Sequence, residues 1–287
     1  MDVAVVGAGR VGTAVAVLLS RAGNRVVAVS GREASRTRVE TWLPGVPYLA
    51  APDATRAAEV ALLAVPDDAI AATCAEIAAA GGFVRGTFVV HLSGAAPLLA
   101  LGPARAMGAH VVSTHPMQTV PDVESGIERL PGAHVAVTAW DEPAFEAGER
   151  VATGWGGQPF RLAEDRKPLY HAAAVFCSNY LVAVEGLAEH LFRLAGLKTP
   201  LPALAPLAEA SLANVIRTGP EAALTGPVVR GDAGTVRRNL EALTAHAPEA
   251  VPAYLALADA AILLAARAGR LGSADAAMLR EVLGEWR

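Results

Sequence analysis

The sequence predicts an α/β fold, with a doubly wound parallel sheet over residues 1–162 and an all-helical domain over residues 163–287. Two observations lead to this prediction. Apolar runs typical of buried strands alternate with helical patterns up to about residue 162, which is the element order of a doubly wound sheet. After that point the strand signals stop, and helical periodicity continues to the end of the chain.

A glycine-rich turn follows the first predicted strand. Residues 3–6 are apolar, a Gly-x-Gly-x-x-Gly pattern begins directly after them, and an apolar helix then extends to about Ser20. The first glycine permits a tight turn, the second lets the backbone approach a pyrophosphate, and the third lets the helix pack on the sheet. The helix N-terminus also presents unpaired N–H groups to phosphates. The pattern predicts a Rossmann dinucleotide site, the alternative being a glycine-rich turn in another kind of α/β protein. The residues assigned to this site are Gly7, Ala8, Gly9, Arg10, Val11 and Gly12.

The second predicted strand, residues 25–29, is followed by Ser30 and Arg32. A fold that binds NAD usually carries Asp or Glu here, to hold the ribose 2′-hydroxyl. A 2′-phosphate would instead be bound by the Ser30 hydroxyl and the planar guanidinium of Arg32. The pattern therefore predicts NADP(H) as the cofactor, the alternative being a solvated arginine near a turn.

Three further strand ends carry candidate ligand contacts, because ligands of open parallel sheets lie beyond the carboxyl ends of the strands. Val65 and Pro66 end the third strand and are assigned to cofactor binding. Ser93 follows the fourth strand, where it can contact the nicotinamide or a substrate, while His91 within that strand is interpreted as a core histidine. His115 follows the fifth strand and is a candidate substrate-binding residue. The strands after the second are expected at residues 61–65, 87–92, 110–114, 134–138 and 156–162.

The composition narrows the function class. The formal net charge is -4 with no block of like charges, so no nucleic-acid or membrane partner is expected. Cys74 and Cys177 lie in apolar contexts and are expected to be small core residues, and no Cys/His spacing of a metal site occurs. No uninterrupted apolar run reaches the ~18–20 residues that span a bilayer, and the first run lacks the basic start of a signal peptide. We therefore expect a soluble, cytoplasmic protein without a metal.

A long helix is predicted from residue 164 to Gly196. One face of it carries Lys167, His171, Ser178 and Glu185, and the stretch around them is mostly apolar. A polar stripe on a buried helix costs free energy unless it is paired or has a function. Further helices are expected at residues 201–217, 233–246, 248–268 and 273–286, with Asp232 and Ser273 as N-caps.

Hydride transfer must be accompanied by a proton, which a Rossmann domain alone does not supply. Lys167, His171, Ser178 and Asn179 are therefore the candidate catalytic residues, since burial tunes a lysine and a histidine needs little tuning. The sequence does not decide between Lys167 and His171 as the proton donor. The alternatives are a solvated Lys167, a Ser178 bonded to a helix carbonyl, and an Asn179 that pairs with the loop at residues 224–232.

Several motifs closely resemble one family. They are Lys167-Pro168-Leu169-Tyr170-His171, its continuation to Tyr180, the stretch from Ala223 to Asp232, Leu92-Ser93-Gly94, and Ser113-Thr114-His115-Pro116. The family comprises Rossmann-like proteins whose helical C-terminal half is called domain of unknown function 2520. The resemblance covers essentially the whole chain. It implies an NADP-binding Rossmann domain, a helical domain used for dimerisation, and an oxidoreductase activity on a substrate that is largely undefined.

More distantly, the layout resembles the 6-phosphogluconate dehydrogenase superfamily, which includes ketopantoate reductases, β-hydroxyacid dehydrogenases and pyrroline-5-carboxylate reductases. The hydroxyacid enzymes carry a catalytic lysine early on the interdomain helix and an asparagine one turn later. Lys167 matches that lysine, whereas His171 stands in place of the asparagine. The resemblance therefore implies a related reaction in which histidine could have taken over the acid role.

The leading functional hypothesis is an NADP(H)-dependent reductase of a small carbonyl or imine compound. The resemblance implies a 2-keto acid such as ketopantoate as the sharpest substrate hypothesis, and Arg230 is the candidate to bind a substrate carboxylate bidentately. The first alternative is a non-catalytic, NADP-sensing binding protein. A third reading is a reductase that uses deazaflavin F420 together with NADP. In each case the helical domain is expected to form a homodimer.

Overall fold

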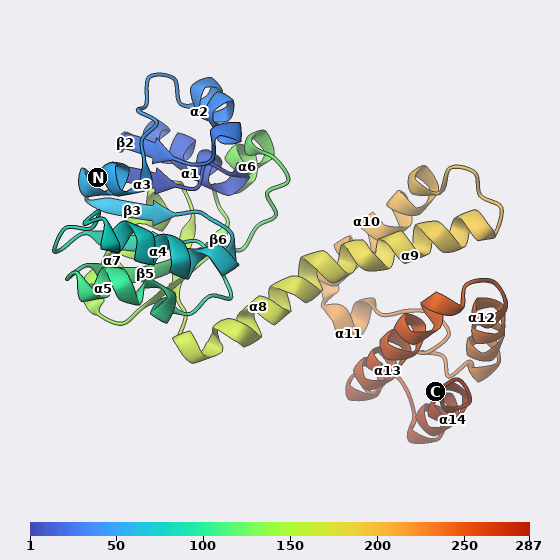
Figure 1. The fold of residues 1–287 in the computed structure, drawn as a ribbon. Coiled ribbons are helices and arrows are strands. Elements are labelled where there is room, and N and C mark those ends of the chain that lie inside the picture. The colour runs from blue at the N-terminus through green and yellow to red at the C-terminus, as the bar shows by residue number, and fades with distance from the viewer. The chain divides into compact units, whose positions relative to one another are not determined.

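The computed structural model describes residues 1–287, which form two compact units, Met1–Asn179 and Tyr180–Arg287 (Figure 1). The first unit holds every strand, and the last strand ends at Arg161. Every element after Arg161 is helical, as the change of pattern near residue 162 predicts. The first compact unit extends to Asn179 and so includes the start of the helix that follows the sheet. The predicted domain boundary at residues 162–163 therefore stays a prediction.

The strands form one seven-stranded sheet in the order β2-β1-β3-β4-β5-β6-β7. In this sheet β2 lies on one side of β1, whereas β3 and β4 lie on the other side. The strand order therefore reverses at β1, which confirms the doubly wound arrangement. All neighbouring strands are parallel except β5 and β6, which are antiparallel. The sequence does not predict this exception, because an apolar run has the same pattern in either direction. The strands are β1 (Asp2–Val6), β2 (Arg25–Ser30), β3 (Val60–Leu63), β4 (Phe88–His91), β5 (His110–Pro116), β6 (His134–Ala139) and β7 (Gln158–Arg161).

Helices cover both faces of this sheet. The helices of the first unit are α1 (Arg10–Arg21), α2 (Arg36–Trp42), α3 (Ala51–Arg56), α4 (Ile70–Ala79), α5 (Gly102–Ala106), α6 (Val123–Arg129), α7 (Glu142–Gly154) and α8 (Lys167–Val175). Val15 of α1 and Val151 of α7 belong to the apolar cluster on one face. Ile77 of α4 and Ala104 of α5 belong to the cluster on the other face. Because both faces are covered, the central strands are apolar at successive positions.

The long helix predicted after residue 164 is not a continuous α-helix. It consists of α8, a π-helical segment over Phe176–Tyr180, and α9 (Leu181–Leu194). A π turn contains more residues than an α turn, so it rotates the following side chains away from the face that precedes it. Lys167 is buried and His171 half-buried, whereas Ser178 is exposed like each of its neighbours over residues 176–184. Their common face therefore stays a prediction.

The second unit consists of helices only. Besides α9 they are α10 (Pro200–Thr218), α11 (Pro220–Ala223), α12 (Ala233–His246), α13 (Val251–Arg267) and α14 (Ser273–Gly284). Leu240, Ile262 and Leu279 are fully buried in their common core. Asp232 caps α12 as predicted, because its carboxylate accepts a hydrogen bond from the N–H of Thr235 at 2.9 Å. The predicted cap at Ser273 is wrong by one residue, since Gly272 is the N-cap and makes no side-chain bond.

Exposed apolar side chains are a marked feature of the helices in the second unit. Val182, Leu207 and Ile216 are exposed to 72%, 65% and 78%, respectively. Cys74 is buried as expected, whereas Cys177, in the π-helical segment, is exposed. An isolated chain therefore presents more apolar surface to water than the sequence-based expectation of a buried helix implies.

Two helical segments, Glu164–Leu194 and Pro248–Arg267, are long and apolar enough to span a membrane by length and composition alone. The core helix of a soluble protein passes the same test. The first segment also carries Glu185 and Glu189 in its second half, and carboxylates are costly inside a bilayer.

Candidate functional site

The first unit contains a cavity of about 1360 Å³ at the carboxyl ends of its central strands. Its wall includes the ends of five neighbouring strands, from β2 to β5 in the order of the sheet. Every residue that the sequence assigns to cofactor binding lines this cavity except Gly12, and His115 lines it as well. The assigned residues on the wall are Gly7, Ala8, Gly9, Arg10, Val11, Ser30, Arg32, Val65, Pro66 and Ser93.

The glycine-rich turn has the geometry of a phosphate cradle. Gly7 has a φ of +106°, and a Cβ there would lie 2.5 Å from the backbone of Ala64. A Cβ on Gly12 would lie 2.2 Å from the carbonyl oxygen of Gly7, so this glycine permits the close packing of α1 on the turn. Gly9 has open space in front of it, and it is the N-cap of α1 without a side-chain bond. The first turn of α1 holds no acid, so its N–H groups are available to an anionic ligand.

The end of β2 supplies the groups expected to recognise a 2′-phosphate. Ser30 is buried at the strand end, and Arg32 follows it with an exposed side chain that has no hydrogen-bond partner. The carbonyl of Arg32 accepts a hydrogen bond from the Tyr48 hydroxyl at 2.8 Å. The backbone of this turn is therefore fixed while the guanidinium stays free to bind a ligand.

Arg38 is a cavity residue that the sequence analysis does not assign. Its Nη1 donates a hydrogen bond to the carbonyl of Ala8 at 2.8 Å, across the cavity wall. Arg36 lies two residues earlier but stacks on the Tyr48 ring and pairs with Glu33 instead. Sequence spacing alone does not separate these two arginines, because the direction of each side chain depends on α2.

Ser93 is a hydrogen-bonding centre at the end of β4. Its hydroxyl donates to the Asp67 carboxylate at 2.5 Å and accepts from the N–H groups of Ala95 and Ala96. Its own N–H donates to Nδ1 of His91 at 3.2 Å. Since the single hydroxyl proton is used within the chain, Ser93 orders the loop that borders the cavity. Its direct contact with cofactor or substrate stays a prediction.

Lys167 lies beneath this loop with only 2% of its surface exposed. Its Nζ donates to the carbonyl of Ser93 at 3.0 Å and to the hydroxyl of Ser113 at 2.7 Å. Burial lowers the pKa of Lys167 to about 8, although Glu164 and Asp67 act in the opposite direction. The ammonium group therefore ties α8 to the ends of β4 and β5, and it does not line the cavity.

Three aromatic side chains gather at the end of β5. Nδ1 of His115 lies 2.9 Å from the hydroxyl of Tyr170, and the His115 ring lies 6.2 Å from the ring of His171. Gly94 separates the two histidines, since a Cβ there would lie 2.9 Å from each ring. Burial lowers the pKa of His115 to about 4, and the charges of Lys167 and His171 add to this shift.

Two of the remaining predicted residues lie outside this cluster in the first unit. Ser178 and Asn179 are exposed in the π-helical segment and make no side-chain hydrogen bond. Arg230 is exposed in the loop between α11 and α12 of the second unit, so its substrate-binding role stays a prediction. The sequence analysis does not assign Tyr170 to the site. Its spacing of three residues from Lys167 places the two on neighbouring positions of one helix face, and this spacing could have identified it.

Solved structures share this fold over nearly the whole chain. A Bacteroides fragilis protein, provisionally described as an NADP oxidoreductase, is 22% identical with a TM-score of 0.76, covering 91% of this chain and 97% of its own. The reductive aminase of Aspergillus terreus, solved with NADPH and ethyl levulinate, is 20% identical with a TM-score of 0.66 over 98% of both chains. The imine reductase of Myxococcus stipitatus, solved with NADP⁺, is 17% identical with a TM-score of 0.64 over 98% of this chain and 99% of that one.

Comparison with family models identifies both parts of the chain, whereas no curated protein matches it. A Rossmann-like domain matches residues 1–116, and the domain of unknown function DUF2520 matches residues 133–261. The first match contains the glycine-rich turn, and the second contains Lys167, Tyr170 and His171. The two matches together show a Rossmann-like domain followed by a DUF2520 domain, which is the domain composition of the family that the motifs resemble.

Proposed function

We propose that the protein is an NADP(H)-dependent oxidoreductase that reduces a small carbonyl or imine compound. One observation carries the proposal: a single cavity joins the phosphate cradle of α1 to His115 at the end of β5. The solved neighbours that bear reductase names and hold NADPH or NADP⁺ support it. A 2-keto acid such as ketopantoate is the specific substrate that we propose to test first.

We assign separate roles in the reaction to the residues around His115. NADPH, when bound, supplies the hydride. His171 does not itself line the cavity, but it is half-buried beside His115, and we propose that it delivers the proton to the substrate from there. Lys167 is too deeply buried to reach the substrate, so it holds the Ser93 loop in place. Gly9 and the N-terminus of α1 would hold the pyrophosphate, and Ser30 and Arg32 would hold the 2′-phosphate.

The test of catalysis is NADPH oxidation against a panel of 2-keto acids and imines. His171→Ala should lower kcat about 10²-fold, the size expected for loss of a general acid. Lys167→Ala should lower kcat as well, with a lower thermal midpoint because the tether to Ser93 is lost. His134→Ala is the matched control, because His134 is an exposed histidine outside the cavity. If neither variant lowers turnover, the assignment is wrong.

Cofactor preference is tested by the fluorescence of bound NADPH and NADH. The native protein should bind NADPH more tightly, because Ser30 and Arg32 meet its additional phosphate. Arg32→Glu should weaken NADPH binding about 10- to 100-fold, the range for loss of charge-assisted hydrogen bonds. Arg21→Glu, at the far end of α1, controls for the change in net charge. Equal affinities in the native protein would contradict the preference.

The competing hypothesis is a non-catalytic protein that senses NADP. It has the same cavity, and it predicts tight NADPH binding with no oxidation by any member of the panel. The two hypotheses differ in His171→Ala, which should leave cofactor binding unchanged in both cases but alters turnover only in an enzyme.

We further propose that a second copy of the chain covers the exposed apolar helices. Val182, Leu207 and Ile216 support this, because surfaces with such exposed side chains are typical of subunit interfaces. Sedimentation equilibrium without detergent should give the mass of a dimer, and Ile216→Glu should give the monomer. A chain that needs detergent to stay dispersed would instead indicate contact with lipid.

A further inference from the structure

The hydrogen bond between His115 and Tyr170 connects the end of β5 to the first turn of α8. The two rings meet edge to face, with centroids 5.5 Å apart and an interplanar angle of 87°. The Tyr170 hydroxyl is the hydrogen-bond partner of Nδ1, at 2.9 Å, and Nε2 of His115 has no partner within the chain. His115 lines the cavity, so its second ring nitrogen is the one left for a ligand.

The direction of this hydrogen bond follows from the basicity of the two groups. A neutral imidazole nitrogen is a much stronger base than a phenol oxygen, so the phenol donates and Nδ1 accepts. Burial keeps both groups neutral near pH 7, since it lowers the pKa of His115 to about 4 and raises the pKa of Tyr170 to about 12. The ring proton of His115 must then reside on Nε2. The reverse direction would leave the half-buried Tyr170 hydroxyl proton without an acceptor.

The surroundings of Nε2 favour a ligand with a lone pair. Nε2 borders Gly94, where a Cβ would lie 2.9 Å from it, so the ring is held against the backbone at the end of β4. The buried Lys167 ammonium group acts on the same ring, because its charge contributes to the lowered pKa of His115, while the Asp67 carboxylate in the cavity wall acts in the opposite direction. A carbonyl oxygen can accept the Nε2 proton in a hydrogen bond. An iminium ion has no lone pair to accept it.

We propose that Tyr170 is a positioning residue that holds His115 in its Nε2–H tautomer, so that His115 donates a hydrogen bond to the carbonyl oxygen of the substrate. A neutral imidazole that donates in this way polarises the carbonyl and stabilises the negative charge that develops on oxygen. The substrate class is therefore a carbonyl compound rather than an iminium ion. This choice of substrate rests on the proposed function, whereas the tautomer of His115 does not.

The tautomer is measured by long-range ¹H–¹⁵N correlation spectra of the full-length protein at pH 8, with His115 assigned by comparison with His115→Gln. We expect one protonated nitrogen, Nε2, in the native protein. Tyr170→Phe should give a mixture of both tautomers. Tyr254→Phe is the matched control, because Tyr254 is also a hydrogen-bonded tyrosine, and its partner is Asn239 in the second unit. A native His115 that carries its proton on Nδ1 would overturn the proposal.

The substrate class is tested with two probes in the presence of NADP⁺, 2-oxobutanoate as the carbonyl compound and N-methyl-1-pyrrolinium as the iminium ion. The Nε2 resonance should shift with 2-oxobutanoate and not with the iminium ion. With NADPH, Tyr170→Phe should lower kcat for 2-oxobutanoate about tenfold to a hundredfold, with a smaller change in KM. A shift or a turnover confined to the iminium ion would contradict the assigned class. Absence of turnover with every substrate would contradict the proposed function while leaving the tautomer result standing.

Discussion

Gly94 is the residue on which the geometry of the histidine cluster depends most directly. A Cβ at this position would lie 2.9 Å from Nε2 of His115 and 2.9 Å from Cδ2 of His171. We expect Gly94→Ala to displace both rings, to lower kcat at least tenfold, and to reduce the free energy of unfolding by about 1–3 kcal/mol, the usual cost of overpacking. Denaturant unfolding and the histidine resonances measure the two effects separately.

Gly186 provides the control for this substitution. It lies inside α9 with nothing within 4 Å of its ideal Cβ. Gly186→Ala should therefore raise the free energy of unfolding by about 1 kcal/mol, because alanine is the better helix former. Unshifted resonances of His115 and His171 in Gly94→Ala would show that the rings tolerate the added methyl group.

Single residues were predictable from the sequence where their role depends on local spacing. Gly7 and Gly12 are required by the turn itself, and Arg32 follows directly from the end of β2, so a short motif is sufficient to place them. Tyr170 and Gly94 take their places only when α8 meets the ends of β4 and β5. No spacing along the chain encodes that meeting.

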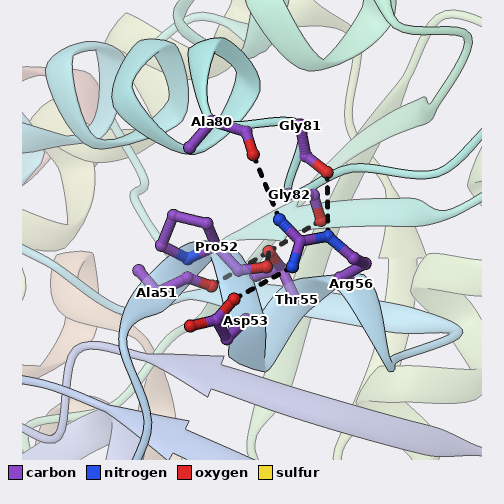
Figure 2. A network of polar contacts seen from close by, with 8 residues as sticks. All are labelled: Ala51, Pro52, Asp53, Thr55, Arg56, Ala80, Gly81 and Gly82. Carbon is purple, nitrogen blue, oxygen red and sulfur yellow. Dashed lines mark hydrogen bonds and ion pairs between the residues drawn. The ribbon is translucent and has the colours of Figure 1, made fainter.

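At the scale of elements, α3 is held to the end of α4 by a small polar network (Figure 2). Arg56 donates hydrogen bonds to the carbonyls of Ala80 at 3.1 Å and Gly81 at 3.2 Å. Carbonyls at the C-terminal end of a helix have no partner within the helix, so Arg56 satisfies them. The Thr55 hydroxyl, fully buried, lies 2.8 Å from the carbonyl of Gly82. The contacts fix the connection between α4 and β4, and β4 carries the Ser93 loop.

Thr55→Val should lower the free energy of unfolding by about 1–3 kcal/mol. Valine has nearly the same shape, but it leaves the carbonyl of Gly82 without its donor in a buried position. Thr41→Val is the matched control, because the Thr41 hydroxyl bonds the Thr37 carbonyl on an exposed helix and should cost less than about 0.5 kcal/mol. Chemical denaturation compares the two variants, and equal effects would mean that the network does not stabilise the fold.

The elements also show where periodicity stops being informative. The strands and most helices occur where the apolar pattern predicts them, because each buries a recognisable face. The π-helical segment over Phe176–Tyr180 changes the phase of that pattern by inserting a wider turn, and no residue type marks it. A periodicity of 3.6 residues therefore does not fix the face of Ser178 relative to Lys167, although the positions of α8 and α9 agree closely with the predicted helix.

At the scale of the whole molecule, the order of predicted strands and helices was sufficient to predict the fold class. It was not sufficient to predict which apolar side chains are exposed. The pattern of Val182, Leu207 and Ile216 is that of an apolar face, which a sequence assigns to a core. Such a face can be covered by the core of the same chain or by a second copy of the chain, and the sequence pattern is the same in both cases. The proposed dimer would supply that cover for Val182, which lies in one of the two segments with membrane-like hydropathy.

Acid stability is a property to which the buried histidines of the first unit contribute together. Burial lowers the pKa of His91 to about 3 and that of His115 to about 4, from an ordinary value of 6.5. Between pH 6.5 and 4 the unfolded chain therefore binds protons at these residues that the folded chain does not bind. The free energy of unfolding should fall as the pH falls through this window, by up to about 1.4 kcal/mol per pH unit for each such histidine.

This slope is measured by guanidinium unfolding of the native protein between pH 8 and pH 4, at pH values about one unit apart. His115→Gln should make the slope shallower, because one of the two histidines no longer takes up a proton on unfolding. His134→Gln should leave the slope unchanged, since His134 is exposed. Carboxylates that titrate in the same range contribute equally to all three proteins, so the difference between variants isolates the histidine. Identical slopes in His115→Gln and the native protein would mean that His115 protonates as readily in the folded chain as in water, and the neutral Nε2–H donor would then be lost near pH 6.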